Sequence, residues 1–267
     1  MFVKRFSSAS GGAALCRRRR DYNDGFSTGP FAAMARLPRL VVPHQPHYIS
    51  QHGHDGQPVF RDSGDYAAYL AWLRDAAKKF GVAVHAYLLL PDEINLLVTP
   101  SDLDGLGRMM QWTGRYYVPW FNRKYARSGT LWSSRYKATV VDAHSHFLDC
   151  CLYMEMRPVL LGAAADPADY RWSSYAHHAG IATDPLIADH PLYWGLGNTP
   201  FEREAAYRRL MERGMSSNEI ARLERAVKAE WAMGSDAFRQ DLEKRTQRRV
   251  GPARRGRPPK GSISAPK

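Results

Sequence analysis

The chain has 267 residues, of which 44% are hydrophobic and 24% are charged, a balance that favours one medium-sized domain with a core and added segments. No apolar run approaches the roughly 18 residues of a membrane span, so we expect no membrane partner. Three cysteines, Cys16, Cys150 and Cys151, make neither a disulfide framework nor a metal-ligand cluster, which favours a cytoplasmic protein.

The net charge of +12 is concentrated at the two ends of the chain. Residues 1–40 carry 8 Lys and Arg against 2 acidic residues, and residues 244–267 carry 9 against none. Residues 41–243 hold 21 basic and 24 acidic residues, so the middle is slightly acidic. Basic ends of this kind are typical of arms that bind a polyanion, although they also serve to keep a chain in solution. We expect nucleic acid as the partner and the nucleoid as the location.

Residues 1–33 are rich in Gly, Ser and Ala, contain the run Arg17–Arg20 and show no periodicity. They are predicted to be a disordered extension, with an over-long reading frame or a targeting peptide as alternatives.

Residues 34–180 are predicted to form the main domain. A first strand at 39–50 is expected at a sheet edge, because Pro43 and Pro46 interrupt it. The elements that follow are a helix from residue 62 or 63 to about 80, strands at 82–90 and 93–99, a helix from 101 that Pro119 kinks or breaks, a strand at 130–142 and a helix at 143–157. This order predicts a ferredoxin-like α+β fold, a split βαβ sandwich with an antiparallel sheet and helices on one face.

Three polar helices are expected after residue 198, at about 200–213, 216–230 and 234–246, as a helical extension over 198–246. An apolar stripe in the second of these fits either a helix-turn-helix or a small bundle that covers the sheet, and we favour the bundle. Residues 247–267 are predicted to be a basic disordered tail. Its segment "RRGRPPKG" is expected to enter a narrow minor groove of DNA through Arg255, Arg257 and Lys260.

The segment 105–141 contains seven basic side chains, no acidic one and many aromatic rings. Cations neutralise phosphates and aromatic faces stack on unpaired bases, so this pattern favours nucleic-acid binding. RNA fits the composition as well as DNA does. Several of the rings, Tyr117 among them, are expected to belong to the core. The predicted DNA contacts are Arg115, Arg123, Lys124, Arg127, Arg135 and Lys137.

Four stretches carry a family resemblance: "HAYLLLPDEINLLVTP", "GTLWSSRYKATVVD", "YMEMRPVLLG" and "DPADYRWSSY". In this order and spacing, over roughly residues 35–180, the chain resembles the single-tyrosine HUH transposases, in particular the repeat-associated tyrosine transposases. The resemblance implies cleavage and rejoining of single-stranded hairpin or repeat DNA, often by a homodimer. It also implies a tyrosine nucleophile and a divalent metal, Mg²⁺ or Mn²⁺. Tyr153, five residues before Pro158-Val159, stands in the place of that nucleophile.

The chain departs from the family at the metal. The two histidines of the family's His-hydrophobe-His motif are replaced by Glu93 and Asn95, and Arg157 stands where the family has a neutral ligand. In one interpretation Glu93 and Asn95, helped by Glu155, still bind the metal through oxygen. In the interpretation that we favour, the cation of Arg157 replaces the metal and pairs with Glu93, so that no metal is bound.

Two functions therefore remain open from the sequence. The first is a DNA-binding protein of the transposase lineage, an enzyme of DNA transposition whose strand cleavage is weakened or lost. The second is a non-catalytic module that recognises hairpin or repeat DNA or RNA.

Overall fold

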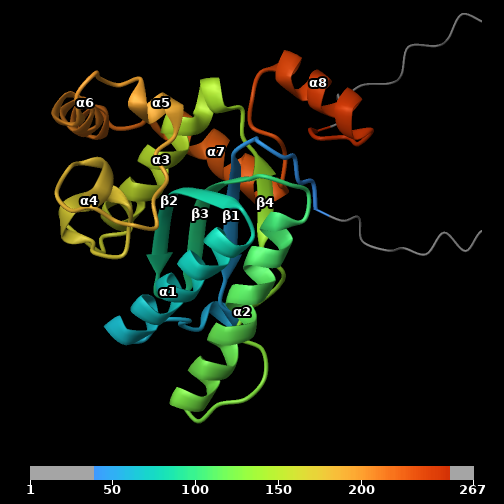
Figure 1. Ribbon diagram of the computed structural model, residues 1–267, viewed down its shortest axis with the longest axis vertical. Coiled ribbons are helices and arrows are strands. Elements are labelled where there is room, and N and C mark those ends of the chain that lie inside the picture. Colours follow the sequence, from blue (N-terminus) through green and yellow to red (C-terminus); the bar gives the residue numbers. More distant parts are fainter. Residues whose placement is uncertain (1–38, 253–267) are drawn as a thin grey trace, which may run out of the picture. The chain divides into compact units, whose positions relative to one another are not determined.

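The computed structural model of the protein describes residues 39–252 (Figure 1). The predictions for residues 1–33 and for Arg255, Arg257 and Lys260 lie outside the described residues. Within the described part, no helix is both long enough and apolar enough to cross a membrane.

Four strands form one antiparallel sheet. They are β1 (His47–His52), β2 (Val82–Leu90), β3 (Glu93–Pro100) and β4 (Lys137–Val140), in the spatial order β2-β3-β1-β4. A tight turn at residues 91 and 92 joins β2 to β3, whereas helices make the other two connections. The predicted α+β fold with an antiparallel sheet is therefore confirmed.

The predicted edge position of the first strand is wrong. β1 pairs with β3 on one side and with β4 on the other, so it lies inside the sheet. The strand begins at His47, after both Pro43 and Pro46, so neither proline removes a hydrogen bond from its ladders. The fourth strand is also shorter than expected, because pairing with β1 covers only residues 137–140.

Helices α1 (Ser63–Lys79) and α2 (Gly105–Lys124) pack on one face of the sheet (Figure 1). A capping box begins α1, in which the side chain of Asp62 accepts hydrogen bonds from the backbone N–H groups of Gly64 and Asp65. Helix α2 does not end at Pro119, as its last turn continues to Lys124. These two helices supply the predicted helical layer.

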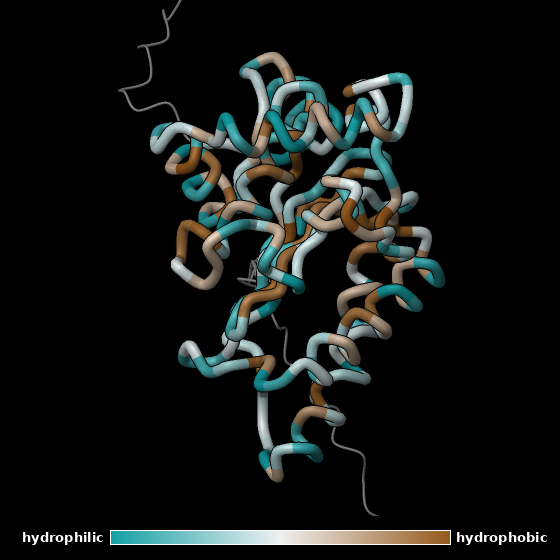
Figure 2. The backbone as a smooth tube through the Cα atoms, turned by 90° about the vertical axis from the view of Figure 1, so that its left-hand side faces the viewer, coloured by the Kyte–Doolittle hydropathy of each residue, from teal (hydrophilic) through white to brown (hydrophobic). Residues whose placement is uncertain are grey.

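Helix α3 (Ala143–Leu160) covers the other face, a layer that the sequence prediction did not include. Side chains alternate along the strands: Ile49 and Leu96 pack with α1 and α2, whereas Tyr48 and Leu97 pack with α3. Hydrophobic stretches of the strands run through the interior between these layers (Figure 2). The sheet therefore has two buried faces and can place different side chains on each.

The C-terminal helices follow α3, and the last three agree closely with the predicted ranges. Helix α7 contacts β1 and β4, so this part of the extension covers the sheet, as the bundle interpretation expects. The remaining elements are η1 (His54–Gly56), η2 (Pro167–Asp169), α4 (Tyr175–His178), α5 (Pro191–Trp194), α6 (Pro200–Arg213), α7 (Ser217–Ala229) and α8 (Asp236–Thr246).

Candidate functional site

A cavity of about 330 Å³ lies where β1, β3, α3 and α7 meet, and we call it the tyrosine pocket. The register of the sheet places Glu93 opposite His52 and Asn95 opposite Ser50, and all four line the pocket. Tyr153 lines it from α3. The fold therefore brings Glu93 and Asn95 together with Tyr153, although they lie far apart in the sequence.

The predicted ion pair between Glu93 and Arg157 is confirmed. Arg157 Nη1 donates to Glu93 Oε1 at 2.8 Å, and Nη2 donates to Oε2 at 2.7 Å. The two side chains are only 9% and 18% exposed, for Glu93 and Arg157 respectively. This two-pronged geometry is the strongest that a guanidinium and a carboxylate form. Both oxygens of the carboxylate are thus already engaged by a cation.

The amide of Asn95 is also engaged. Tyr48 Oη donates to Asn95 Oδ1 at 2.9 Å, whereas Asn95 Nδ2 is buried without a hydrogen-bond partner in the described structure. Burial raises the pKa of the Tyr48 hydroxyl well above its usual value, so this donor keeps its proton. The oxygen that would serve a metal instead accepts a hydrogen bond from a tyrosine.

Tyr153 is 5% exposed and lies beneath α7. Its hydroxyl donates to Glu224 Oε1 at 3.0 Å, and the guanidinium carbon of Arg157 is 5.7 Å from the centre of its ring. Burial raises the pKa of Tyr153, Arg157 lowers it in part, and Glu224 raises it further. The phenol therefore stays protonated and faces a carboxylate. The sequence analysis missed Glu224, which is 71 residues from Tyr153 and belongs to no local motif.

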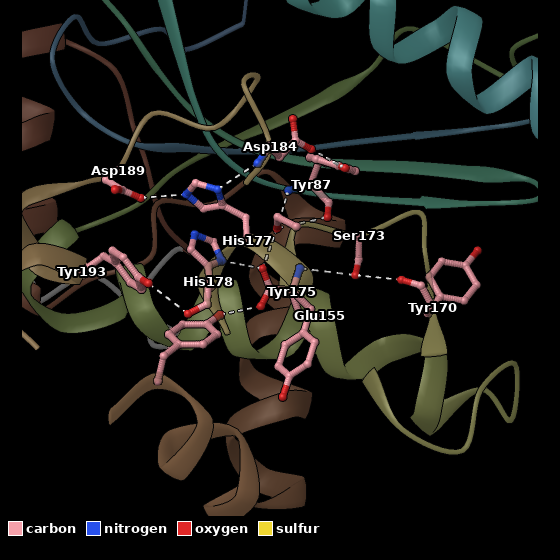
Figure 3. A network of polar contacts seen from close by, with 12 residues as sticks. Tyr87, Glu155, Tyr170, Ser173, Tyr175, His177, His178, Asp184, Asp189 and Tyr193 are labelled. Carbon is pink, nitrogen blue, oxygen red and sulfur yellow. Dashed lines mark hydrogen bonds and ion pairs between the residues drawn. The ribbon is translucent and has the colours of Figure 1, made fainter. Parts of the chain in front are cut away.

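Glu155 does not join the pocket. It is fully buried in a separate network, where Oε1 accepts from Ser174 Oγ at 2.5 Å and from His178 Nδ1 at 2.7 Å (Figure 3). Its Oε2 accepts from Tyr207 Oη at 2.6 Å. Glu155 thereby ties α3 to α6 and to the segment 174–178. The expected third oxygen ligand faces away from the other two.

The tyrosine pocket does not fit a divalent metal. Mg²⁺ and Mn²⁺ need several free oxygen ligands. Here the oxygens of Glu93 and Asn95 are occupied, and the guanidinium of Arg157 would repel a cation. Among residues 39–252, no group of three or more His, Cys, Asp and Glu side chains is placed to hold a metal ion.

The predicted DNA-contacting cations fall into different environments. Lys124 Nζ is 2.7 Å from Asp62 Oδ2 and 2.6 Å from Asp65 Oδ1, so its charge is already neutralised within the protein. Arg127 Nη2 donates to the carbonyl of Thr130 at 3.0 Å, and Lys137 Nζ donates to the carbonyl of Lys228 at 3.0 Å. The guanidiniums of the exposed Arg115, Arg123 and Arg135 have no hydrogen-bond or ion-pair partner in the described part of the chain.

No protein-family model matches the chain, and no curated protein matches it. Among solved structures, the chain is similar to a REP-associated tyrosine transposase bound to a REP hairpin. That likeness has a TM-score of 0.46 and 13% identity, and it covers 59% of this chain and 92% of the other. A candidate transposase from Deinococcus radiodurans R1 is similar with a TM-score of 0.33 and 21% identity, over 42% of this chain and 90% of the other. Both solved structures are described as transposases.

Proposed function

We propose that this protein binds DNA and descends from the tyrosine transposases, but does not cleave DNA strands by their metal-dependent route. The observation that carries the proposal is the two-pronged pair of Glu93 and Arg157 at the place of the family's metal. A metal could enter only by displacing the guanidinium. Breaking a buried ion pair by removing one partner costs about 3–5 kcal/mol, so such displacement is strongly disfavoured.

The surroundings of Tyr153 support the same conclusion. A tyrosine attacks a phosphodiester after giving up its proton, with a nearby cation or metal to balance the charge. In this pocket the hydroxyl keeps its proton and donates a hydrogen bond to Glu224. The carboxylate of Glu224 would repel an approaching phosphate, and α7 leaves the phenol nearly inaccessible.

DNA binding is supported by the chain's cations. The segment 105–141 carries seven basic side chains and no acidic one, and Arg115, Arg123 and Arg135 are exposed. Such groups bind phosphates without sequence preference. From the motif resemblance, the proposed target is single-stranded hairpin or repeat DNA in the nucleoid, bound by a monomer or a homodimer.

The experiment is a cleavage assay with a control for the nucleophile. The purified full-length protein and a Tyr153→Phe variant are incubated with an end-labelled single-stranded DNA hairpin in Mg²⁺ or Mn²⁺, and the products are separated under denaturing conditions. Retention of the hairpin on a native gel, with no shortened strand and no covalent DNA–protein adduct, is the expected result for both proteins. An adduct that forms with the wild type and disappears with Tyr153→Phe would show that the enzyme is active and the proposal is wrong.

A further inference from the structure

A second, open cavity of about 640 Å³ lies between α2, β1 and the segment 132–136, and we call it the arginine groove. It faces the opposite side of the sheet from the tyrosine pocket. The alternation along β1 shows this, because Gln51 lines the groove whereas Ser50 and His52 line the pocket. Nothing in the resemblance to transposases assigned a role to this groove.

The groove is strongly cationic. Three guanidiniums line it, from Arg39, Arg108 and Arg135. The acidic residue in its lining, Asp104, already pairs with Arg108 at 3.3 Å. The guanidinium of Arg135 has no hydrogen-bond or ion-pair partner among residues 39–252. The groove therefore keeps positive charge that the described protein leaves uncompensated.

Aromatic rings stand beside these cations. The guanidinium carbon of Arg39 lies 3.6 Å from the centre of the Tyr136 ring, and its Nε donates to the Tyr136 carbonyl at 2.7 Å. Trp132 is half-buried and lines the groove next to Arg135. Single-stranded nucleic acid binds where cations lie next to an aromatic ring. Its phosphates bind the cations, and its bases stack on the ring.

Two glycines leave the α2 side of the groove without side chains at their positions. Gly107 and Gly114 lie seven positions apart on α2, hence on one face of the helix, and both line the groove. A Cβ atom at Gly114 would meet nothing within 4 Å, and one at Gly107 would meet only Tyr136 Oη at 3.9 Å. Glycine inside a helix costs about 1 kcal/mol relative to alanine. Packing within the described protein does not require glycine at either position. A ligand that approaches the backbone of α2 closely would require it.

We propose that the arginine groove binds single-stranded DNA, with a phosphate on Arg135 and a base against Trp132. This inference rests on the proposed DNA-binding function and names the site that performs it. Cavities of about 300–1,000 Å³ hold ligands of nucleotide size, which suits a flexible single strand. DNA held here lies across the sheet from Tyr153, so binding and strand attack are spatially separated within one copy of the chain.

The test measures binding of fluorescein-labelled oligothymidylate of about 15 nucleotides to the full-length protein by fluorescence anisotropy. Gly114→Glu brings a carboxylate into the groove at a position with free space, and Gly114→Gln brings the same bulk without charge. We expect Gly114→Glu to weaken binding by about tenfold or more, and Gly114→Gln by about two- to fourfold. Thermal unfolding of both variants confirms that they are folded.

A second pair of variants separates the groove from general surface charge. Arg135→Ala is expected to weaken binding by about five- to twentyfold and to reduce the slope of log affinity against log salt by about 0.7. Arg74→Ala removes the same charge from an exposed site on α1 outside the groove, and we expect less than about a twofold change.

Each other outcome has a definite meaning. If the wild type binds while Gly114→Glu and Arg135→Ala bind equally well, the groove is the wrong site and the proposed function stands. If Arg74→Ala loses as much affinity as Arg135→Ala, binding is diffuse and the inference fails. Tighter binding of a matched duplex or of oligouridylate would overturn the choice of single-stranded DNA. If the wild type binds no nucleic acid, the proposed function itself is wrong.

Discussion

The two faces of the sheet hold cavities of opposite character. In the tyrosine pocket the charged groups beside Tyr153 have partners within the protein: Arg157 pairs with Glu93, and Glu224 accepts from Tyr153. In the arginine groove, Arg135 has no such partner in residues 39–252, and the cavity is roughly twice as large. Polar side chains that satisfy one another stabilise a fold, whereas unpaired cations are available to a ligand. Under the two proposals, DNA is bound on one face of the sheet and Tyr153 lies on the other.

The largest expected effect comes from breaking the ion pair of the tyrosine pocket. Arg157→Met should lower the free energy of unfolding by about 3–5 kcal/mol, because it leaves the carboxylate of Glu93 buried and uncompensated. Urea denaturation measures the change. The double variant Glu93→Gln/Arg157→Met should recover most of the loss. A loss below about 1 kcal/mol in the single variant would mean that the pair is effectively solvated and the pocket is open.

The network around Glu155 supplies the next effect. Tyr207→Phe removes one hydrogen bond to a buried carboxylate and should cost about 1.5–3 kcal/mol of stability, measured in the same way. The matched control is Tyr175→Phe, because the Tyr175 hydroxyl has no hydrogen bond within residues 39–252 and this tyrosine, 8% exposed, is also buried in the same region. We expect a cost below about 0.5 kcal/mol for the control. Equal costs would show that Glu155 contributes little to holding α6.

A smaller effect, a gain in affinity for Mn²⁺, is expected when the histidines of the resembled family are introduced. The triple variant Glu93→His/Asn95→His/Arg157→Asn removes the guanidinium and supplies two imidazoles on adjacent same-face positions of β3. Isothermal titration should show Mn²⁺ binding at least about tenfold tighter than to the wild type, which is about 1.4 kcal/mol. Arg157→Asn alone serves as the control for loss of the cation. No gain in the triple variant would indicate that these residues do not define an ancestral metal position.

The protonated state of Tyr153 gives a prediction for alkaline pH. The folded protein holds this proton above the ordinary tyrosine pKa of about 10, whereas the unfolded chain releases it, so stability falls as pH rises above about 10. Tyr153→Phe removes this contribution. Between about pH 9 and about pH 11 its unfolding free energy should fall by about 1 kcal/mol less than that of the wild type. Identical losses in urea titrations at the two pH values would mean that Tyr153 ionises normally and is accessible.

The smallest expected effect concerns Lys137, whose ammonium is bound to the carbonyl of Lys228 at the rim of the tyrosine pocket. Lys137→Ala should weaken binding of oligothymidylate by only about twofold, less than Arg135→Ala, since the lysine is partly committed within the protein. Anisotropy measurements on the two variants in parallel decide this. A larger loss for Lys137→Ala would place DNA on the tyrosine side of the sheet.

Local patterns in the sequence predicted the elements well. β2 coincides with its predicted range because an apolar run ends at the Pro91-Asp92 turn, and α1 begins at its capping residue Asp62. The ion pair of Glu93 and Arg157 was also predictable, because the resemblance placed both at one vacated site. In each case the relevant signal was a short motif.

Pairing between distant segments could not be predicted in the same way. The neighbours of β1 depend on which strands meet in space, and proline positions alone suggested an edge. Glu155 was expected at a metal, yet its partners Tyr207 and His178 lie 52 and 23 residues away. Lys124 is neutralised by acidic residues about sixty positions earlier. The basic residues around it in the sequence gave no sign of this contact.

Because β1 lies inside the sheet, its residues line both the arginine groove and the tyrosine pocket. Successive residues of the strand point in turn towards the tyrosine pocket and towards the arginine groove, as Ser50, Gln51 and His52 do. A deletion or insertion of one residue in β1 would move each following side chain of the strand to the opposite face of the sheet. Such a change should remove the side chains that line both cavities at once, whereas a point substitution alters one cavity at a time.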